Sequence, residues 1–341
     1  MSDAEILSPA RSPLRRLTGV QIIGTGSYVP DNVVTNEDLA SLGCDADWII
    51  QRTGIRERRH APPEIATSDM AFAAAERCIQ AAEIDRSRID LLVLGTLSPD
   101  YLLPATAAAV QDRLGLNCAA MDVSAACAGF MYAMVTGMQY VATGCSEFAL
   151  VIGSDTNSRV MNPDDKKTYP LFGDGAGAVL ITRGSPEQGM LAYTLGADGS
   201  GEKLLVRPGG GSRAPLNICN PPGADWYVKM DGRPVFKWAV RLLEDSSREV
   251  LASAGFTTAD VKLWLFHQAN IRILDAAVTA LGIDRERDCE THIDRYGNTS
   301  AGSVPIALDE AFRAGRFSRK DLLMLSGFGG GLAWGTTLLR W

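Results

Sequence analysis

One cysteine of this chain stands where a nucleophile would be useful. Cys127 follows residues 120–123, which are typical of a short buried strand, and precedes apolar residues at helical spacing. The residues between are small enough for a tight turn, so we expect Cys127 at the N-terminus of a helix. Unpaired backbone N–H groups and the positive end of the helix dipole would favour its thiolate there. The pattern indicates a nucleophile, although a free cysteine is just as often a small buried side chain.

Two polar residues in the second half of the chain could assist such a nucleophile. His267 directly follows an apolar strand, and Asn298 lies in a glycine-containing turn before a helix. Alone, His267 would be a structural histidine, Asn298 a turn residue or cap, and the glycine run 329–331 a flexible loop. In open α/β sheets, however, sites gather outside the carboxyl ends of strands. We therefore expect Cys127, His267 and Asn298 to converge.

The elements that must position these residues alternate between strands and helices. Apolar runs and helical periodicity predict strands at 20–23, 91–95, 120–123, 148–153, 175–182, 263–266, near Cys289, at 322–326 and at 333–339. They predict helices at 68–82, 105–114, after Cys127, and at 234–254, 271–281 and 300–313. We predict a flexible leader at residues 1–18, followed by two similar α/β halves at residues 19–190 and 191–341.

Composition and charge narrow the possible functions. Of 341 residues, 46% are hydrophobic and 21% charged, as in a globular protein with a large core. The formal net charge of −7 gives no general attraction to nucleic acid or to anionic membranes. No spanning helix or signal peptide is recognised, which predicts a cytoplasmic protein. The seven cysteines form no CxxC pair, so neither a disulfide framework nor a zinc site is expected.

Two further segments carry weaker signals. Gly24-Thr25-Gly26 lacks the third glycine and the helix of a dinucleotide-binding loop, so we interpret it as the end of a strand. Residues 47–59 combine Trp48 with several arginines, which gives an acidic protein a local positive patch. Such a patch suits either solvent or a phosphate-bearing ligand.

Together, the motifs resemble the ketoacyl synthase III branch of the thiolase-fold condensing enzymes, the 3-oxoacyl-acyl carrier protein synthases that start fatty acid chains. The likeness extends from about Val20 to Trp341. It rests on segments in family-like order and spacing, namely IIGTGSYVP, DWIIQRTGIRERR, DVSAACAGF, LFGDGAGAV, FHQANIRI, DRYGNTSAGSVPIALDEA and GFGGGLAWG. The resemblance implies an α/β, thiolase-like fold whose two pseudo-duplicated halves form α-β-α-β-α layers.

The resemblance also implies a reaction, the decarboxylative Claisen condensation of an acyl-CoA starter with malonyl-acyl carrier protein. Cys127 would take an acyl group from acetyl coenzyme A or a similar thioester, and the carbanion released on loss of carbon dioxide would attack it. His267 and Asn298 would each donate an N–H to the malonyl thioester oxygen. The backbone N–H groups of Cys127 and Gly330 would form the oxyanion hole. Coenzyme A thioester is a substrate in this scheme, and no permanent cofactor or metal is implied.

Binding residues are implied in the same way. Contacts to coenzyme A would come from Trp48, Arg52, Lys166, Asn270 and Arg272, and the acyl pocket would be lined by Phe172, Met230, Phe236 and Phe328. Leu103 resembles the dimer-loop residue that closes the partner's acyl pocket, which implies a homodimer. Lys237 and Arg272 would contact the carrier protein. The implied partners are acyl-CoA, malonyl-acyl carrier protein and a second copy of this chain, without nucleic acid or membrane.

Two places depart from the best-known members of the family. Lys166 replaces an arginine that stacks with the tryptophan on adenine, so the charge is kept but the planar surface is lost. Thr279 and Ala280 replace adjacent lysines that serve the acidic carrier protein. Carrier docking would then be weaker or would use other arginines, such as Arg285 and Arg287.

Other functions of the same fold stay open. A condensing or acyl-transfer enzyme of a secondary-metabolite pathway could carry these motifs and use another donor or acceptor. Elongating synthases are less favoured, because they use two histidines and Asn298 occupies one of those places. Thiolases are less favoured too, because they need a second reactive cysteine near the C-terminus, and the Phe328-Gly329-Gly330 segment has none. A non-catalytic partner subunit would normally lose the nucleophile. The sequence leaves open the preferred acyl group and the conformation of the loop at residues 208–227.

Overall fold

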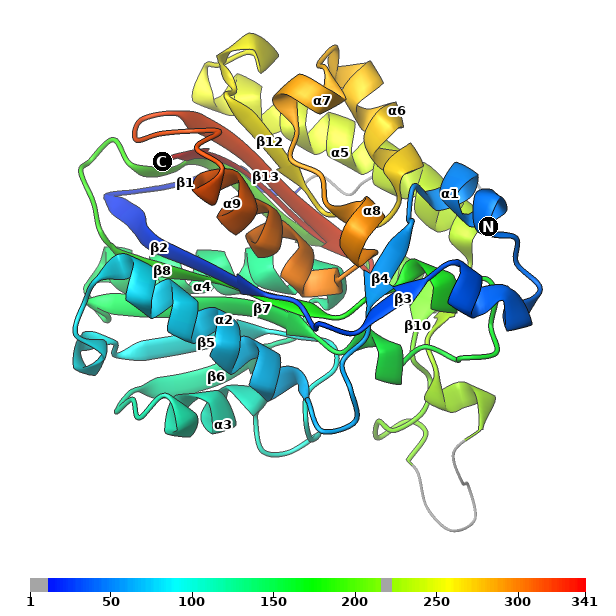
Figure 1. Ribbon diagram of the computed structural model, residues 1–341. Helices are drawn as coiled ribbons and strands as arrows, with labels where there is room; N and C mark the ends of the chain where they lie inside the picture. Colours follow the sequence, from blue (N-terminus) through cyan, green and yellow to red (C-terminus); the bar gives the residue numbers. More distant parts are fainter. Residues whose placement is uncertain (1–11, 216–222) are drawn as a thin grey trace.

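The computed structural model describes residues 12–215 and 223–341, which form two five-stranded sheets with helices between and outside them (Figure 1). The first sheet has the order β2-β8-β7-β5-β6 and the second the order β1-β9-β14-β13-β12. Strand β5 pairs in parallel with β6 and β7, and β8 is antiparallel to β2 and β7. In the second sheet only the β12–β13 pair is parallel.

The strands of the first sheet are β2 (Val20–Tyr28), β5 (Leu91–Gly95), β6 (Ala119–Val123), β7 (Phe148–Asp155) and β8 (Gly175–Arg183). Those of the second are β1 (Arg15–Thr18), β9 (Gly189–Ala197), β12 (Leu263–Phe266), β13 (Leu322–Gly329) and β14 (Ala333–Arg340). Two short ribbons pair β3 (Val33–Thr35) with β4 (Glu57–Arg59), and β10 (Leu205–Val206) with β11 (Lys229–Met230). The helices are α1 (Ala46–Thr53), α2 (Thr67–Ala82), α3 (Thr106–Arg113), α4 (Gly129–Thr143), α5 (Gly232–Ala254), α6 (Ile271–Leu281), α7 (Arg285–Asp288), α8 (Ile293–Tyr296) and α9 (Ser303–Arg313).

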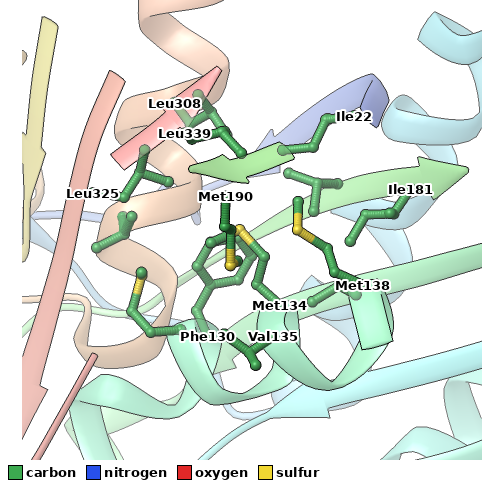
Figure 2. Packing of buried hydrophobic residues seen from close by; sticks show 14 of the residues in the cluster. Ile22, Phe130, Met134, Val135, Met138, Ile181, Met190, Leu308, Leu325 and Leu339 are labelled. Carbon is green, nitrogen blue, oxygen red and sulfur yellow. The ribbon is translucent and has the colours of Figure 1, made fainter. Parts of the chain in front are cut away.

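Helix α4 lies in the middle of the molecule, between the two sheets. Most of its side chains are apolar and buried, as expected for a central helix. Its exposed side chains lie near its C-terminal end, at Gln139, Tyr140 and Thr143. Figure 2 shows Phe130, Met134 and Met138 packed between Ile181 of the first sheet and Leu325 of the second. Helix α9 belongs to the same buried cluster. The two central helices therefore share one core with both sheets.

The remaining long helices cover the outer faces of the sheets. Helices α2 and α3 pack on the first sheet, and α5 and α6 pack on the second. The layers therefore follow the order helix, sheet, helix, sheet, helix, which confirms the predicted α-β-α-β-α architecture. The turn Ala126–Ala128, which follows β6, contacts β13 of the second sheet and the turn Ser300–Gly302 before α9, so residues of the two halves meet there.

The N-terminal leader and the boundary between the halves differ from the prediction. The leader expected at residues 1–18 ends earlier, because Arg15–Thr18 forms β1 on the second sheet, where Leu17 is buried and pairs with Met190. Residues 1–11 of that leader lie outside the described residues. The predicted boundary between residues 190 and 191 falls inside β9, a strand that the sequence analysis missed.

Two smaller predictions are also corrected. The strand expected near Cys289 is only a single bridge from Cys289 to Trp264. Gly24-Thr25-Gly26 is not the end of a strand, because β2 continues to Tyr28. A Cβ atom on Gly26 would lie 2.4 Å from the backbone of α2. The glycines therefore serve the close packing of α2 on β2.

Candidate active site

Cys127 lies in a short 3-10 turn, Ala126–Ala128, directly before α4 and after the strand β6. Ala126 has φ +48°, in the left-handed region that residues with a Cβ seldom adopt. This conformation turns the chain sharply between strand and helix. The predicted strand–turn–helix setting of Cys127 is confirmed.

The resting state of the Cys127 thiol differs from the expectation of a favoured thiolate. Burial is the main reason that its pKa is raised to about 12; a hydrogen bond from Ser300 opposes the shift, and the nearby charge of Asp155 contributes to it. Burial disfavours the charged form of the sulfur more strongly than the start of a helix favours it. Cys127 is therefore a neutral thiol at rest and must lose its proton when a substrate arrives.

Ser300 connects Cys127 to Asn298. Its hydroxyl donates to the Cys127 sulfur over 3.2 Å, and its backbone N–H donates to Asn298 Oδ1 over 2.8 Å. Ser300 is fully buried and has φ +52°, a second strained residue beside the thiol. Because the Asn298 oxygen accepts this bond, the Nδ2 amino group is the donor that its side chain can offer to a ligand.

A buried carboxylate anchors the same turn. Asp155, at the end of β7, accepts the backbone N–H of Ala301 over 3.0 Å and the Thr96 hydroxyl over 2.9 Å. Burial raises the pKa of Asp155, and these hydrogen bonds oppose that shift. Asp155 therefore ties the end of β5 in the first half to the turn from the second half. Sequence analysis missed both Asp155 and Ser300. The only signal in the sequence was that Asp155 is a polar residue after a buried apolar run.

The backbone of Asn298 is held by the first half of the chain. Its N–H donates to the Leu171 carbonyl over 2.8 Å, and its carbonyl accepts the N–H of Gly173 over 3.0 Å. These bonds flank a bridge between Asn298 and Phe172. Asn298 is thus fixed to the wall where the resemblance placed the acyl pocket.

His267 lies at the end of β12, and its backbone N–H donates to the Ser326 carbonyl. The ring is almost fully buried, with Nδ1 2.6 Å from the Ser303 hydroxyl and the ring centre 5.0 Å from that of Phe328. Burial lowers its pKa to about 3, and the neighbouring His292 adds to the shift. His267 is therefore neutral, and a neutral imidazole can donate one N–H.

The glycine loop lies against the nucleophile. A Cβ atom on Gly329 would lie 2.6 Å from the backbone nitrogen of Cys127, and one on Gly330 would lie 2.8 Å from the carbonyl oxygen of Leu205. Only a bare backbone can approach so closely. The structure therefore brings Cys127, the segment with Gly330, His267 and Asn298 together around the turn that begins at Ser300.

The residues implied for coenzyme A lie on and beside helices α1 and α6. Trp48 is 46% exposed, and the Arg52 guanidinium lies 5.6 Å from its ring centre. Asn270 caps α6 by accepting the Arg272 N–H over 2.9 Å, so its side-chain oxygen is already engaged. Arg272 is exposed and lies 5.9 Å from the ring centre of Phe236. Lys166 is exposed in the loop before Thr168, near Cys44.

The residues implied for the acyl pocket are divided between two apolar clusters and more exposed positions, with Phe236 packed against the cluster that holds Phe328. Phe172 and Phe328 are buried in different apolar clusters, while Phe236 and Met230 are partly exposed. Leu103 is 87% exposed. The part of the loop at 208–227 that spans 216–222, including Cys219, lies outside the described residues.

A hollow that the sequence analysis missed opens beside the strand ends of the first half. Its volume is about 840 Å³, and its walls include Thr67, Asp122, Thr156, Arg207 and Trp226. Tyr101 and Leu102 line its rim and are 68% and 83% exposed. Exposed apolar side chains beside a hollow are typical of interaction surfaces.

The five layers and the cysteine-centred meeting of strand ends define the class of this protein as the thiolase-fold condensing enzymes. Two family profiles match the chain: 3-Oxoacyl-[acyl-carrier-protein (ACP)] synthase III over residues 121–199, and 3-Oxoacyl-[acyl-carrier-protein (ACP)] synthase III C terminal over residues 251–341. The β-ketoacyl-[acyl-carrier-protein] synthase III of Rhodopirellula baltica is 50% identical, over 95% of this chain and 99% of its own length. That of Geobacillus kaustophilus is 47% identical, over 95% and 99%.

Solved structures agree with these relatives. The β-ketoacyl-[acyl carrier protein] synthase III of Thermus thermophilus is 39% identical and superposes with a TM-score of 0.88, over 94% of this chain and 98% of that one. The priming β-ketosynthase from the R1128 polyketide biosynthetic pathway is 32% identical, with a TM-score of 0.88 over 98% of both chains. The chain belongs to the β-ketoacyl-[acyl-carrier-protein] synthase III family, and it is an acyltransferase of the condensing type.

Within residues 12–215 and 223–341, no group of three or more His, Cys, Asp or Glu side chains is placed to hold a metal ion. No helix in the same part of the chain has the length and apolar character needed to cross a bilayer.

Proposed function

We propose that this chain starts fatty acid synthesis by condensing an acyl-CoA with malonyl-acyl carrier protein, releasing coenzyme A and carbon dioxide. The observation that carries the proposal is the turn at Ser300, which joins the thiol of Cys127 to the amide of Asn298 in one hydrogen-bonded unit. A thiol beside two neutral N–H donors suits acyl transfer followed by stabilisation of an enolate.

In the first half-reaction, the Cys127 sulfur attacks the thioester carbon of acyl-CoA. The carbon–sulfur bond to coenzyme A breaks, and the thiol proton leaves with the coenzyme A sulfur. The negative oxygen of the tetrahedral intermediate is bound by the backbone N–H groups of Cys127 and Gly330. The close approach of the glycine loop to Cys127 supports this arrangement.

In the second half-reaction, the malonyl thioester loses carbon dioxide and its electron pair moves onto the thioester oxygen. His267 and Asn298 each donate an N–H to that oxygen, and the resulting carbanion attacks the acyl carbon on Cys127. The bond to the Cys127 sulfur breaks, giving 3-oxoacyl-acyl carrier protein and a Cys127 thiolate, which takes up a proton from solvent to restore the resting thiol. The low pKa of His267 supports its role as a neutral donor, because a neutral ring keeps its proton when the oxygen becomes negative.

A homodimer is supported by two exposed features of the first half. Strand β6 is at the edge of its sheet, and Ala119 in it is exposed. Exposed sheet edges are normally covered or paired. The apolar segment Tyr101-Leu102-Leu103 projects nearby, with Leu103 87% exposed. We propose that β6 pairs with its copy and that Leu103 closes the acyl pocket of the partner subunit.

The carrier protein is proposed to dock at Lys237 and Arg272 and not at the alternative arginines. Arg285 forms an ion pair with Asp275 at 2.8 Å, and Arg287 forms one with Asp288. Within the described part of the chain, no carboxylate lies within ion-pair distance of Lys237 or of Arg272. Unpaired cations attract an acidic partner more strongly than cations that already have a carboxylate.

The cysteines support a cytoplasmic setting. All six cysteines within the described ranges are free, as is usual where thiols are kept reduced.

Coenzyme A, itself a thiol, is held as substrate by the exposed Trp48, Arg52 and Lys166 in this proposal. The same residues would release it after acyl transfer.

The proposal is tested by intact mass after incubation with acetyl-CoA, followed by addition of malonyl-acyl carrier protein. We expect one acetyl group per chain, located on Cys127, and then its transfer to the carrier protein as the 3-oxoacyl product. Absence of acetylation with a panel of straight and branched acyl-CoA donors contradicts the proposal. Loading only from an acyl carrier protein, or preference for a bulky donor, favours a role like that of the polyketide priming enzyme.

A further inference from the structure

Ser303, the first residue of α9, contacts both histidines of the second half. Its hydroxyl oxygen lies 2.6 Å from Nδ1 of His267, and its backbone carbonyl lies 3.0 Å from Nε2 of His292. Ser303 and His292 are fully buried, and His267 is 1% exposed. Ser303 is therefore held between the two rings, and few hydrogen-bond acceptors are available to its hydroxyl proton.

The available donors and acceptors decide where that proton lies. The described contacts of the Ser303 hydroxyl are His267 Nδ1 and the backbone N–H of Gln268, at 3.5 Å. A backbone N–H can only donate, so it cannot accept the Ser303 proton. The hydroxyl therefore donates to Nδ1 of His267, and Nδ1 acts as the acceptor. In a neutral imidazole, the other nitrogen, Nε2, then carries the hydrogen.

The opposite tautomer of His267, with the hydrogen on Nδ1, is disfavoured by the same donors and acceptors. If Nδ1 carried the hydrogen, the Ser303 oxygen would accept from both Nδ1 and Gln268, and its own proton would have no acceptor among the described residues. A buried polar hydrogen without an acceptor is destabilising. In addition, Nε2 would present a lone pair, and not an N–H, to a negative oxygen.

We propose that Ser303 is a positioning residue that holds His267 in the Nε2–H tautomer, ready to donate to the oxygen of a thioester enolate. This rests on the proposed function, because that function gives His267 its role as donor. His292 supports Ser303 by donating its own Nε2–H to the Ser303 carbonyl, which fixes the start of α9. The turn from Ser300 to Ser303 thus touches Cys127 at one end and His267 at the other.

The tautomer itself can be measured on the unmodified, full-length protein by ¹⁵N NMR of labelled histidine. The chain has only three histidines, so each ring can be assigned by single substitutions of His60 and His292. We expect His267 to show a protonated Nε2 and an unprotonated, hydrogen-bonded Nδ1 from pH 6 to pH 8. A protonated Nδ1, or an imidazolium, overturns the proposal. This result does not depend on whether the enzyme condenses.

The functional consequence is tested with Ser303→Ala. We expect acylation of Cys127 to stay within about twofold of the parent, while condensation falls roughly 10- to 100-fold, as is typical when a partner that orients an active-site ligand is removed. Mixed tautomers of His267 should appear in the NMR spectrum. The matched control is Ser247→Ala, because Ser247 is also fully buried and its hydroxyl has no partner within the described residues. That control should change neither half-reaction.

Four outcomes separate the possibilities. Condensation of Ser303→Ala within twofold of the parent overturns the proposal, as does an equal loss in both half-reactions, which would indicate a merely structural role. If Ser303→Ala does not fold, the tautomer of the unmodified protein decides alone. If the unmodified protein carries the Nε2–H tautomer but does not condense, the proposed function fails and the assignment of Ser303 stands.

Discussion

The reaction centre and the surface around it are organised in opposite ways. Cys127, His267 and Asn298 are almost fully buried, and each is hydrogen-bonded to a serine of the turn 300–303. By contrast, Trp48 is 46% exposed and Leu103 is 87% exposed. The fold thus fixes the positions of the reacting groups before any substrate binds. The residues proposed to bind the acyl donor and the partner subunit are exposed to solvent.

The difference has a physical origin. A buried polar atom must find a partner inside the protein, so every group near Cys127 constrains its neighbours. An exposed side chain such as that of Lys237 can take water as its partner, so the fold constrains its position less. Substitutions at the centre should therefore affect single chemical steps strongly, and substitutions at the surface should change affinity and selectivity by smaller factors.

The largest effect is expected for Cys127→Ala, which should abolish acyl loading. No other cysteine in the described ranges lies at a strand-to-helix turn against the glycine loop. Intact mass after incubation with acetyl-CoA measures the loss. Loading of the mutant at the parental rate would show that another residue is the nucleophile. The buried centre would then not be the place where the acyl group is held.

His267→Ala and Asn298→Ala should separate the two half-reactions. Acylation of Cys127 should remain measurable, while release of carbon dioxide from the malonyl substrate falls about 100- to 1,000-fold, the usual cost of removing one donor to a developing oxyanion. Carbon dioxide release and intact mass are measured on the same samples. If one of these mutants condenses at a rate within a few-fold of the parent, the residue replaced in it is not a donor to the malonyl thioester oxygen.

Lys237→Glu should weaken docking of the acidic carrier protein without changing acetyl-CoA loading. We expect KM for malonyl-acyl carrier protein to rise roughly 3- to 10-fold at low salt, and less at high salt, because the contribution is electrostatic. Arg287→Glu is the matched control, since Arg287 already pairs with Asp288. An equal rise in both variants would show that the effect follows net charge and not a docking site.

Leu103→Ala should affect turnover of acetyl-CoA least and should instead shift the selectivity among acyl donors. If Leu103 closes the partner's acyl pocket, each extra methylene admitted contributes about 0.8 kcal/mol, or roughly fourfold per carbon, until the space is filled. Specificity constants for short and medium acyl donors are compared on protein shown by light scattering to be dimeric. An unchanged ratio, with every donor affected alike, indicates that Leu103 only packs an interface.

Much of the fold and of the centre could be predicted from sequence. Apolar runs gave the bounds of β5, β12 and α6 as the structure has them, because these elements are fully or half buried and their periodicity is strong. Cys127 and His267 follow strands as predicted, whereas Asn298 follows helix α8 and is held by a single bridge to Phe172. Strand β9 and the bridge at Cys289 were misjudged, since short or Gly-rich segments owe their structure to neighbours distant in sequence.

The protonation state of Cys127 and the roles of its supporting residues could not be predicted. The strand-to-helix turn suggested a thiolate, but complete burial between the halves raises the pKa of the thiol to about 12. Ser300 is 173 positions from Cys127, and Asp155 is 146 from Ala301, so no local pattern marks their contacts. Such contacts exist only once the two halves have packed.

The most direct test of the account is a chase of preloaded enzyme. Labelled acetyl-CoA is used to load the parental protein, free coenzyme A and unreacted donor are removed, and malonyl-acyl carrier protein is added in a single turnover. The account predicts that label leaves Cys127 and appears in equal amount in the 3-oxoacyl-acyl carrier protein, with one carbon dioxide released per acyl group. Label that stays on Cys127 while carbon dioxide is released, or product that forms without passing through Cys127, would contradict it.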